Sequence, residues 1–353
     1  MKLKIGIIDS DITYVKRFMS NVQRRLSDDM ELYVYTSMEE AHLGLKKVYL
    51  DVLLVAEEIQ FDRHAIPGGI VLICFTKKDN VEEIDGIPAI SKYHQKLTEI
   101  YKNILNIYAE KSVIEVNKKR MQNANFHLFI SVQGGVGVTT TAASYAVNLA
   151  QKGKQVFFLS LDTFGDISLY FSGEGKQSFT DILNALKKDI NIEAKFKSVV
   201  KVDSSNVEFL DVCKNAYDMV ELKDSELEAL IEAILTFEKP YDEIVIEYSG
   251  NMDKRMLLLM KKYANTIIYV NDGTSIGNCK FQRFCEAIKV IEYKEETHLL
   301  NKMRLLYNKF SSKTSQQLSE TAIPVIGGIH RFVGLSEKEI IHKMADLPEL
   351  RWD

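Results

Sequence analysis

The segment with the clearest chemical potential is the loop QGGVGVTT, which follows the apolar run HLFISV. Gly134, Gly135 and Gly137 allow successive backbone N–H groups to converge on a phosphate, and the positive end of the following helix favours the same anion. Thr139 stands where a hydroxyl group completes the coordination of Mg²⁺ in loops of this kind. The spacing therefore predicts a nucleotide-binding loop. Its residues are Gln133, Gly134, Gly135, Val136, Gly137, Val138, Thr139 and Thr140.

This loop lacks the positive charge that usually accompanies its spacing. Gln133 and Val138 occupy the two positions where a lysine is expected. One charge pair at about 4 Å contributes roughly 4 kcal/mol at an effective dielectric constant of about 20, before the cost of desolvation. The loop amides, the helix end and Mg²⁺ still favour binding, whereas stabilisation of the charge that develops during phosphoryl transfer suffers more. We therefore expect nucleotide binding with weak or absent hydrolysis; a glycine turn without a ligand is the alternative.

Three segments further along the chain complete a pattern that resembles the MinD/ParA group of ATPases. The loop of that group, K-G-G-x-G-K-T-T, matches this one apart from its lysines. The resemblance implies ATP and Mg²⁺ as cofactors, with Asp162, in VFFLSLD, positioning the attacking water. It also implies that Glu247 replaces the usual aspartate and supports Mg²⁺ through water, and that Asn308 recognises adenine. The implied metal residues are Thr139, Asp162 and Glu247. The alternatives are a loop cap for Asp162 and a turn former for Asn308.

The first part of the chain resembles a response-regulator receiver domain. Such domains hold acids after the first strand, a phosphorylated aspartate at the end of the third strand and a lysine after the fifth. Here IIDSD supplies Asp9 and Asp11 and AISKY supplies Lys92, but DVLLVAEE places Ala56 at the acceptor position. A methyl group cannot accept a phosphoryl group, and Glu57 would point to the other face of the strand. The resemblance therefore implies a recognition module rather than a working phosphorelay site.

The elements that must position these residues alternate between strands and helices. Apolar or β-branched runs, such as KIGIIDS and GGIVLICF, are separated by stretches with apolar residues at helical spacing. A helix expected from Gln95 to Ala109 leads into a charged linker, and the pattern restarts at Asn125. Such alternation favours parallel sheets covered by helices. We expect two doubly wound α/β domains: a receiver-like (flavodoxin-like) domain with linker at 1–122 and a MinD/ParA-like P-loop domain at 123–353.

Composition limits the classes of function. The 353 residues carry a formal net charge of −4 without a long basic run, which argues against nucleic acid as a partner. The 4 scattered cysteines lack metal-ligand spacing and favour buried thiols in a reducing compartment. No apolar run approaches the roughly 20 residues that span a bilayer, and the N-terminus does not resemble a signal peptide. We therefore expect a cytoplasmic protein without an integral membrane segment.

The combination of the two domains resembles the TadZ/CpaE family, whose members localise and help assemble the tight-adherence (Flp-type) pilus machinery. The resemblance implies an ATP-binding localisation and assembly factor that forms a homodimer. It also implies that pilus or secretion proteins bind the receiver-like domain, at the cell pole or the inner face of the membrane. The alternative function is an active MinD/ParA-type ATPase in DNA partitioning or division-site placement. Lys254 and Arg255, which follow Glu247, are candidates for replacing the missing charge.

The alanine at position 56 generates a first prediction. Incubated with a small-molecule phosphodonor and Mg²⁺, the protein should gain no acid-labile phosphoryl group on residues 1–122, because Ala56 offers no carboxylate. Intact-mass measurement before and after incubation checks this, with an active receiver domain as the positive control. An adduct of one phosphoryl group within residues 1–122 would contradict the interpretation of this domain as a recognition module.

Overall fold

The chain forms two compact units, and neither is a single stretch of sequence. The computed structural model describes residues 2–63, 66–93, 95–111, 124–188, 190–237 and 240–352. The first unit comprises Met1–Lys119, Glu174–Gln177 and Asp181–Val199; the second comprises Arg120–Gly173, Ser178–Thr180 and Val200–Asp353. The boundary expected near residue 123 lies outside the described residues, so the division at 122/123 stays a prediction. None of the described helices combines the length and the apolar character needed to cross a bilayer.

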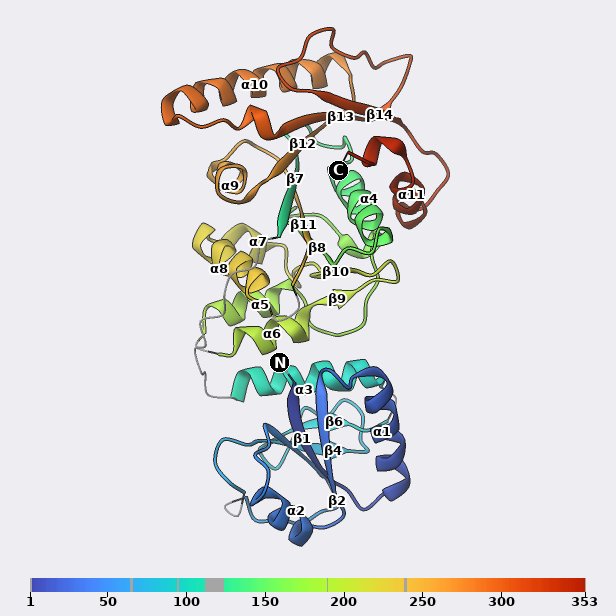
Figure 1. The fold of residues 1–353 in the computed structure, drawn as a ribbon, viewed down its shortest axis with the longest axis vertical. Coiled ribbons are helices and arrows are strands. Elements are labelled where there is room, and N and C mark those ends of the chain that lie inside the picture. The colour runs from blue at the N-terminus through green and yellow to red at the C-terminus, as the bar shows by residue number, and fades with distance from the viewer. Residues whose placement is uncertain are drawn as a thin grey trace. The chain divides into compact units, whose positions relative to one another are not determined.

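The first unit is built on a six-stranded sheet in the order β2-β1-β3-β4-β6-β5. All neighbouring strands are parallel except β5 and β6, which form a short antiparallel pair that the sequence pattern did not indicate. The elements are β1 (Leu3–Ile8), α1 (Ile12–Arg25), β2 (Met30–Tyr35), α2 (Met38–Leu45), β3 (Val52–Ala56), β4 (Val71–Thr76), β5 (Glu83–Ile84), β6 (Ile87–Ser91) and α3 (Leu97–Lys111). The expected doubly wound class is confirmed for this unit (Figure 1).

The central strand β3 explains why the sequence pattern was informative here. All five of its residues, VLLVA, are buried, as is usual for parallel strands that are covered on both faces. Helix α1 buries Val15, Phe18 and Val22 at helical spacing, and these side chains join the main core of the unit with Ile5. The carboxyl ends of β1, β3 and β6 consequently meet at one edge of the sheet, where the receiver-like polar residues lie.

Helix α6 (Ile192–Val199) belongs to the first unit although it lies far along the chain. It packs against α3, and Ala194 is fully buried in the same apolar cluster as Ile104 and Leu105. Lys195, almost fully buried, places its Nζ 2.5 Å from Asn106 Oδ1 and 3.1 Å from Glu110 Oε1. A buried ammonium group requires such partners, so α6 is fixed on α3 by polar as well as apolar contacts.

The second unit is built on an eight-stranded sheet in the order β14-β13-β12-β7-β11-β8-β10-β9, antiparallel only between β9 and β10. Its strands are β7 (Asn125–Ser131), β8 (Val156–Ser160), β9 (Lys201–Val202), β10 (Val207–Phe209), β11 (Glu243–Ser249), β12 (Thr266–Asn271), β13 (Met303–Phe310) and β14 (Val325–His330). The α-helices are α4 (Val138–Gln151), α7 (Tyr217–Glu221), α8 (Asp224–Leu235), α9 (Lys254–Leu258), α10 (Ser275–Glu295) and α11 (Glu337–Ala345); α5 (Phe179–Leu186) precedes α6. Short 3-10 or π segments are η2 (Ile167–Leu169), η3 (Leu259–Tyr263), η4 (Leu300–Lys302) and η5 (Pro348–Leu350).

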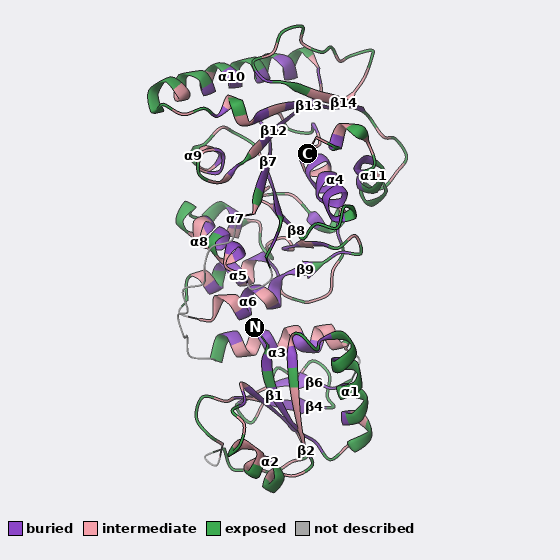
Figure 2. Cartoon of the chain, viewed as in Figure 1, coloured by how far each residue is buried: buried purple, intermediate pink, exposed green. Residues whose placement is uncertain are grey.

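Helix α4, which follows the glycine-rich loop, is the most deeply buried helix of this unit (Figure 2). The C-terminal segment covers one side of it: α11 packs on α4, and Asn148 Nδ2 donates to Ala345 O at 2.7 Å. Trp352, the single tryptophan of the chain, stacks on Tyr145 with ring centroids 4.7 Å apart and an interplanar angle of 10°. The fluorescence of Trp352 therefore reports on the packing of α4.

The packing of α6 on α3 predicts that the first unit is sensitive to the size of the side chain at position 194. Ala194→Leu should destabilise the first unit by about 1–3 kcal/mol, because extra methyl and methylene groups have no room in a packed core. Hydrogen exchange of the α3 amides should become faster in this variant. Ala229→Leu, the same change at a half-exposed position of α8, is the matched control. Equal exchange in the two variants would contradict the assignment of α6 to the first unit.

Candidate functional site

The polar residues identified in the second half of the sequence gather at one edge of the second sheet. Because β7, β8, β11, β12, β13 and β14 are mutually parallel, their carboxyl ends meet there, which is where parallel sheets bind ligands. The loop after β7 turns through Gly135 and Gly137, with left-handed φ angles of +76° and +86°. Gly137 begins α4 without a side-chain cap. The first N–H groups of this helix therefore remain available to an anion.

Asn308, at the end of β13, is bound to the loop itself. Its side chain is 3% exposed, and Nδ2 donates to the carbonyl of Val136 at 2.8 Å. A Cβ added at Gly137 would lie 2.5 Å from Asn308 Nδ2, so this close approach requires glycine as much as the positive φ does. The structure thus places Asn308 at the loop as a buried hydrogen-bond donor. Recognition of adenine by Asn308 stays a prediction.

Glu247, on β11, contacts Thr139, one of the two other residues expected at the metal. Its buried carboxylate accepts from the hydroxyls of Thr139 at 3.2 Å, Ser160 at 2.6 Å and Ser249 at 2.7 Å. Burial raises the pKa of Glu247, the three hydroxyl donors act against that rise, and the charge of Asp162 adds to it. Hydroxyl and carboxylate oxygens are ligands that Mg²⁺ accepts, and the pairing of Thr139 with Glu247 fits the expected site. The described residues hold no cluster of three or more His, Cys, Asp or Glu side chains at metal-binding distances, so water and phosphate would complete such a shell.

The two aspartates of the segment LDTFGD cap the backbone in this structure. Asp162 Oδ1 accepts from the N–H of Phe164 at 3.0 Å. Asp166 accepts from the N–H of Ser168 at 3.0 Å and from its hydroxyl at 2.6 Å. These are the loop-cap contacts that stood as the alternative for Asp162. Its role with water and Mg²⁺ stays a prediction.

Gln133 and Val138, which replace the expected lysines, are both held by their own chain. Gln133 Nε2 donates to Asp272 Oδ2 at 2.9 Å, and Asp272 directly follows β12. Asp272 Oδ1 also accepts from the N–H and the hydroxyl of Thr274, at 3.0 Å and 2.8 Å. Val138 is 4% exposed and belongs to the main apolar core. Neither position can therefore supply charge to the loop.

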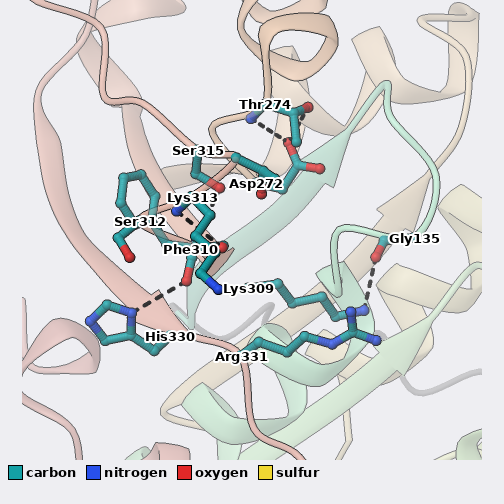
Figure 3. A pocket seen from close by; sticks show the side chains of 12 residues that line it. Gly135, Asp272, Thr274, Lys309, Phe310, Ser312, Lys313, Ser315, His330 and Arg331 are labelled. Atoms are coloured by element: carbon teal, nitrogen blue, oxygen red, sulfur yellow. Dashed lines mark hydrogen bonds between the residues drawn. The ribbon is translucent and has the colours of Figure 1, made fainter.

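The positive charge near the loop comes from residues that were not predicted. A cavity of about 600 Å³ opens beside Gly135, and Lys309, His330 and Arg331 line it (Figure 3). Lys309 Nζ donates to the carbonyl of Gly135 at 2.8 Å. Burial and the neighbouring Arg331 lower the pKa of Lys309, and Asp272 acts in the opposite direction. The sequence signal was available, since Lys309 and His330 lie at the carboxyl ends of β13 and β14 and Arg331 follows β14 directly.

Of the two candidates named from sequence for replacing the lost charge, Arg255 is bound elsewhere in its own chain. Arg255 lies 3.3 Å from Asp224 through Nε and also donates to the carbonyl of Leu222. Lys254 is exposed at the start of α9. A role of either residue in place of the lost lysines stays a hypothesis.

The receiver-like residues of the first unit form an internally paired cluster. Lys92 Nζ lies 2.6 Å from Asp9 Oδ2, and the two side chains are 1% and 2% exposed. Glu58 Oε2 lies 3.7 Å from the same ammonium group. Asp11 is the N-cap of α1 and accepts from the N–H of Tyr14 at 2.9 Å. Ala56 is buried at the end of β3, so the cluster presents no acceptor at that position.

Glu57 lies away from this ion pair, as the alternation of side chains along a strand predicted. It accepts from the hydroxyl of Thr76 at 2.6 Å, at the end of β4, and this contact lowers the pKa of Glu57. Thr76 is fully buried and was not identified from the sequence. The contact with Thr76 holds Glu57 at the end of β4, so the acids nearest to Lys92 are Asp9 and Glu58.

Comparison with known families identifies both halves of the chain. Residues 1–109 match the family model of the TadZ-like receiver domain, and residues 125–300 match the model of an AAA domain. The chain therefore joins an N-terminal α/β receiver domain of the TadZ-like family to a C-terminal α/β AAA domain, and the second domain shares the fold of a ParA family ATPase.

Individual relatives are distant. A putative arsenical pump-driving ATPase 2 from Aquifex aeolicus is 29% identical over 130 residues, which are 34% of this chain and 44% of that protein. The chain thus spans less than half the length of this curated relative. A ParA family ATPase from Chlorobium tepidum has a TM-score of 0.51 and 19% identity, covering 65% of this chain and 97% of that one. This similarity shows the fold alone. A plasmid partition protein from Borrelia burgdorferi, solved with AMPPNP, has a TM-score of 0.46 and 18% identity, covering 63% and 90%.

The buried pair of Lys92 and Asp9 predicts a strong dependence of stability on both partners. Lys92→Met should lower the free energy of unfolding by about 3–5 kcal/mol, because it leaves the Asp9 carboxylate buried and uncompensated. Adding Asp9→Asn should recover most of that loss, since it removes the unpaired charge. Chemical denaturation followed by circular dichroism measures both effects.

The control for this prediction is Lys77→Met, which removes an exposed partner of Glu58. Lys77 Nζ lies 2.5 Å from Glu58 Oε1, but the two side chains are 49% and 38% exposed. Solvent-exposed ion pairs contribute little to stability, so this change should have a much smaller effect. A Lys92→Met variant no less stable than Lys77→Met would contradict a structural role for the buried pair.

Proposed function

We propose that this protein is an ATP-binding localisation and assembly factor for a tight-adherence (Flp-type) pilus or a related secretion machine. The observation that carries the proposal is the occurrence, in one chain, of a TadZ-like receiver domain and a MinD/ParA-type P-loop domain. The internally paired cluster around Lys92 and the alanine at position 56 support a receiver domain that binds partners rather than receiving phosphoryl groups. A cytoplasmic location, at the pole or the inner face of the membrane through partners, is part of the same proposal.

Binding of ATP with Mg²⁺ is supported by the geometry of the loop. Gly134 and Gly135 are exposed, and the helix that begins at Gly137 has no side-chain cap. We propose that the loop from Gln133 to Thr140 holds the phosphates. Thr139, with Glu247 and Asp162 nearby, would hold Mg²⁺, which neutralises phosphate charge when bound.

Weak or absent hydrolysis is proposed on the basis of charge. Transition-state stabilisation in phosphoryl transfer depends on cations placed where negative charge develops. Gln133 hydrogen-bonds Asp272 of its own chain, and Val138 is packed in the core. ATP would therefore act as a bound structural ligand, in a homodimer formed by the P-loop domain, more than as a fuel.

The second candidate function is an active MinD/ParA-type ATPase in DNA partitioning or division-site placement. The similarity to the fold of the Chlorobium tepidum ParA family ATPase favours it. The two functions differ in turnover and in the partner bound. Phosphate release at a rate typical of active ATPases, stimulated by DNA, would favour the second candidate. Tight nucleotide binding with negligible release would favour the assembly factor.

The exposed glycine at position 134 allows a sharp test of ATP binding. A Cβ added at Gly134 would meet no atom within 4 Å, and its φ is not left-handed, so substitution there should leave the unliganded fold intact. Mg²⁺-ATP at a hundred times its Kd should stabilise the wild-type protein by about 2.7 kcal/mol. Gly134→Asp should abolish this gain because its carboxylate repels the phosphates.

The measurement is thermal unfolding followed by the emission of Trp352, which packs on α4. Gly134→Asn is the matched control, since it has nearly the same shape without the charge, and it should retain more of the stabilisation. If millimolar Mg²⁺-ATP leaves the unfolding curve of the wild-type protein unchanged, the loop is a glycine turn without a ligand.

A further inference from the structure

We propose that Lys309 and Arg331 supply the positive charge that the phosphate-binding loop lacks. In this inference the two side chains bind the polyphosphate of a nucleotide in the cavity beside Gly135. The inference rests on the proposed function, because it specifies how the same site holds its anion. It concerns residues that come from strands β13 and β14 rather than from the loop.

The backbone at Lys309 is the first observation. Lys309 has a φ of +53°, in the left-handed region that residues other than glycine and asparagine avoid at a cost of about 1–2 kcal/mol. This conformation occurs directly after Asn308, whose amide is fixed on Val136. The ammonium group of Lys309 donates to the carbonyl of Gly135 at 2.8 Å (Figure 3). Strain of this kind is typical of functional sites.

The balance of charge in the cavity is the second observation. Its lining includes four basic residues, Lys309, Lys313, His330 and Arg331, and one acid, Asp272. Asp272 already accepts hydrogen bonds from Gln133 and Thr274. Among the ion pairs of the described residues, no carboxylate lies within 4.0 Å of Lys309 or Arg331. Two adjacent cations without a carboxylate partner repel each other, and an anion between them relieves that repulsion.

The hydrogen-bonding capacity of these groups indicates which anion fits. The ammonium group of Lys309 has three N–H donors and uses one on Gly135, and the guanidinium group of Arg331 offers a planar set suited to phosphate oxygens. Hydroxyl groups of Ser311, Ser312 and Ser315 also line the cavity, next to the ring of Phe310. The volume of about 600 Å³ is in the range of small-molecule sites. The class of ligand is therefore a nucleoside polyphosphate.

The test compares ligands that differ in phosphate content on the full-length protein. Calorimetry gives the Kd of AMPPNP with Mg²⁺, of adenosine and of pyrophosphate for the wild-type protein and its variants. Lys309→Met and Arg331→Met should each weaken AMPPNP binding by about 10-fold or more, the factor expected from loss of one charge-assisted contact. Adenosine binding should change by less than about 2-fold, because adenosine carries no phosphate. Lys309→Arg should bind AMPPNP more tightly than Lys309→Met because it keeps the charge.

Two controls exclude an effect on folding or on overall charge. Lys289→Met removes an exposed lysine from α10, outside the cavity, and should leave every Kd unchanged. Circular dichroism and Trp352 emission establish that Lys309→Met and Arg331→Met keep the fold. If a methionine variant unfolds, Lys309→Arg or Arg331→Lys takes its place. The salt dependence of AMPPNP binding by that variant is then compared with the salt dependence for the wild-type protein.

The outcomes separate this inference from the function on which it rests. If the wild-type protein binds neither AMPPNP nor pyrophosphate, the proposed ATP-binding function fails and the inference fails with it. If the wild-type protein binds AMPPNP and Lys309→Met binds it equally well, the function stands and this inference is wrong. An equal loss of adenosine and AMPPNP affinity would also overturn it. Tight binding of pyrophosphate, lost in both methionine variants, would support it and identify the polyphosphate as the recognised part.

Discussion

The hydrogen bond from Asn308 to the carbonyl of Val136 is the interaction on which the geometry of the glycine-rich loop depends. It joins the loop after β7 to the end of β13, two strands away in the sheet order β13-β12-β7. Both groups are buried, and an unpaired amide or carbonyl there would carry a large desolvation cost. The same contact leaves no room for a Cβ at Gly137 and fixes the strand end from which Lys309 extends. The contact of Asn308 with Val136 therefore fixes both the geometry of the loop and the position of the neighbouring lysine.

The fold class could be predicted because parallel strands are locally recognisable. Buried runs such as VLLVA in β3, alternating with helical spacing, indicate a doubly wound sheet without any knowledge of long-range contacts. The position of α6 could not be predicted in this way. Lys195 in IEAKFKSV is a residue type that usually lies in solvent, and only the approach of α3, about 90 residues earlier, buries it beside Asn106. Periodicity defines the face of a helix but not the element that it packs on.

At the candidate site, too, the sequence pattern did not identify residues that come from distant parts of the chain. The loop and Thr139 were predicted from motif spacing and Glu247 from the resemblance to the MinD/ParA group. The structure brings Thr139 and Glu247 within hydrogen-bonding distance. Lys309 and Arg331 were not predicted, although Lys309 lies near the end of β13 and Arg331 directly follows β14. A motif search examines the positions where lysine usually stands, whereas the order of strands in the sheet decides which later residue can reach the loop. That order places the carboxyl end of β13 near the loop, so Lys309 can reach Gly135, 174 residues earlier in the chain.

The cluster around Lys92 in the first unit and the cavity beside Gly135 in the second unit differ in how far nearby acids neutralise their positive charge. In the first unit, Lys92 is buried against Asp9 and Glu58, so its charge is already neutralised by its own chain and offers little to an incoming anion. In the second unit, Lys309 and Arg331 lie beside each other on a cavity, and the one acid that lines it is hydrogen-bonded to Gln133 and Thr274. A cation that is already neutralised by its own chain has less electrostatic reason to bind phosphate than two adjacent cations with no carboxylate in direct contact. This difference is why we propose phosphate binding for the second unit and partner recognition for the receiver domain.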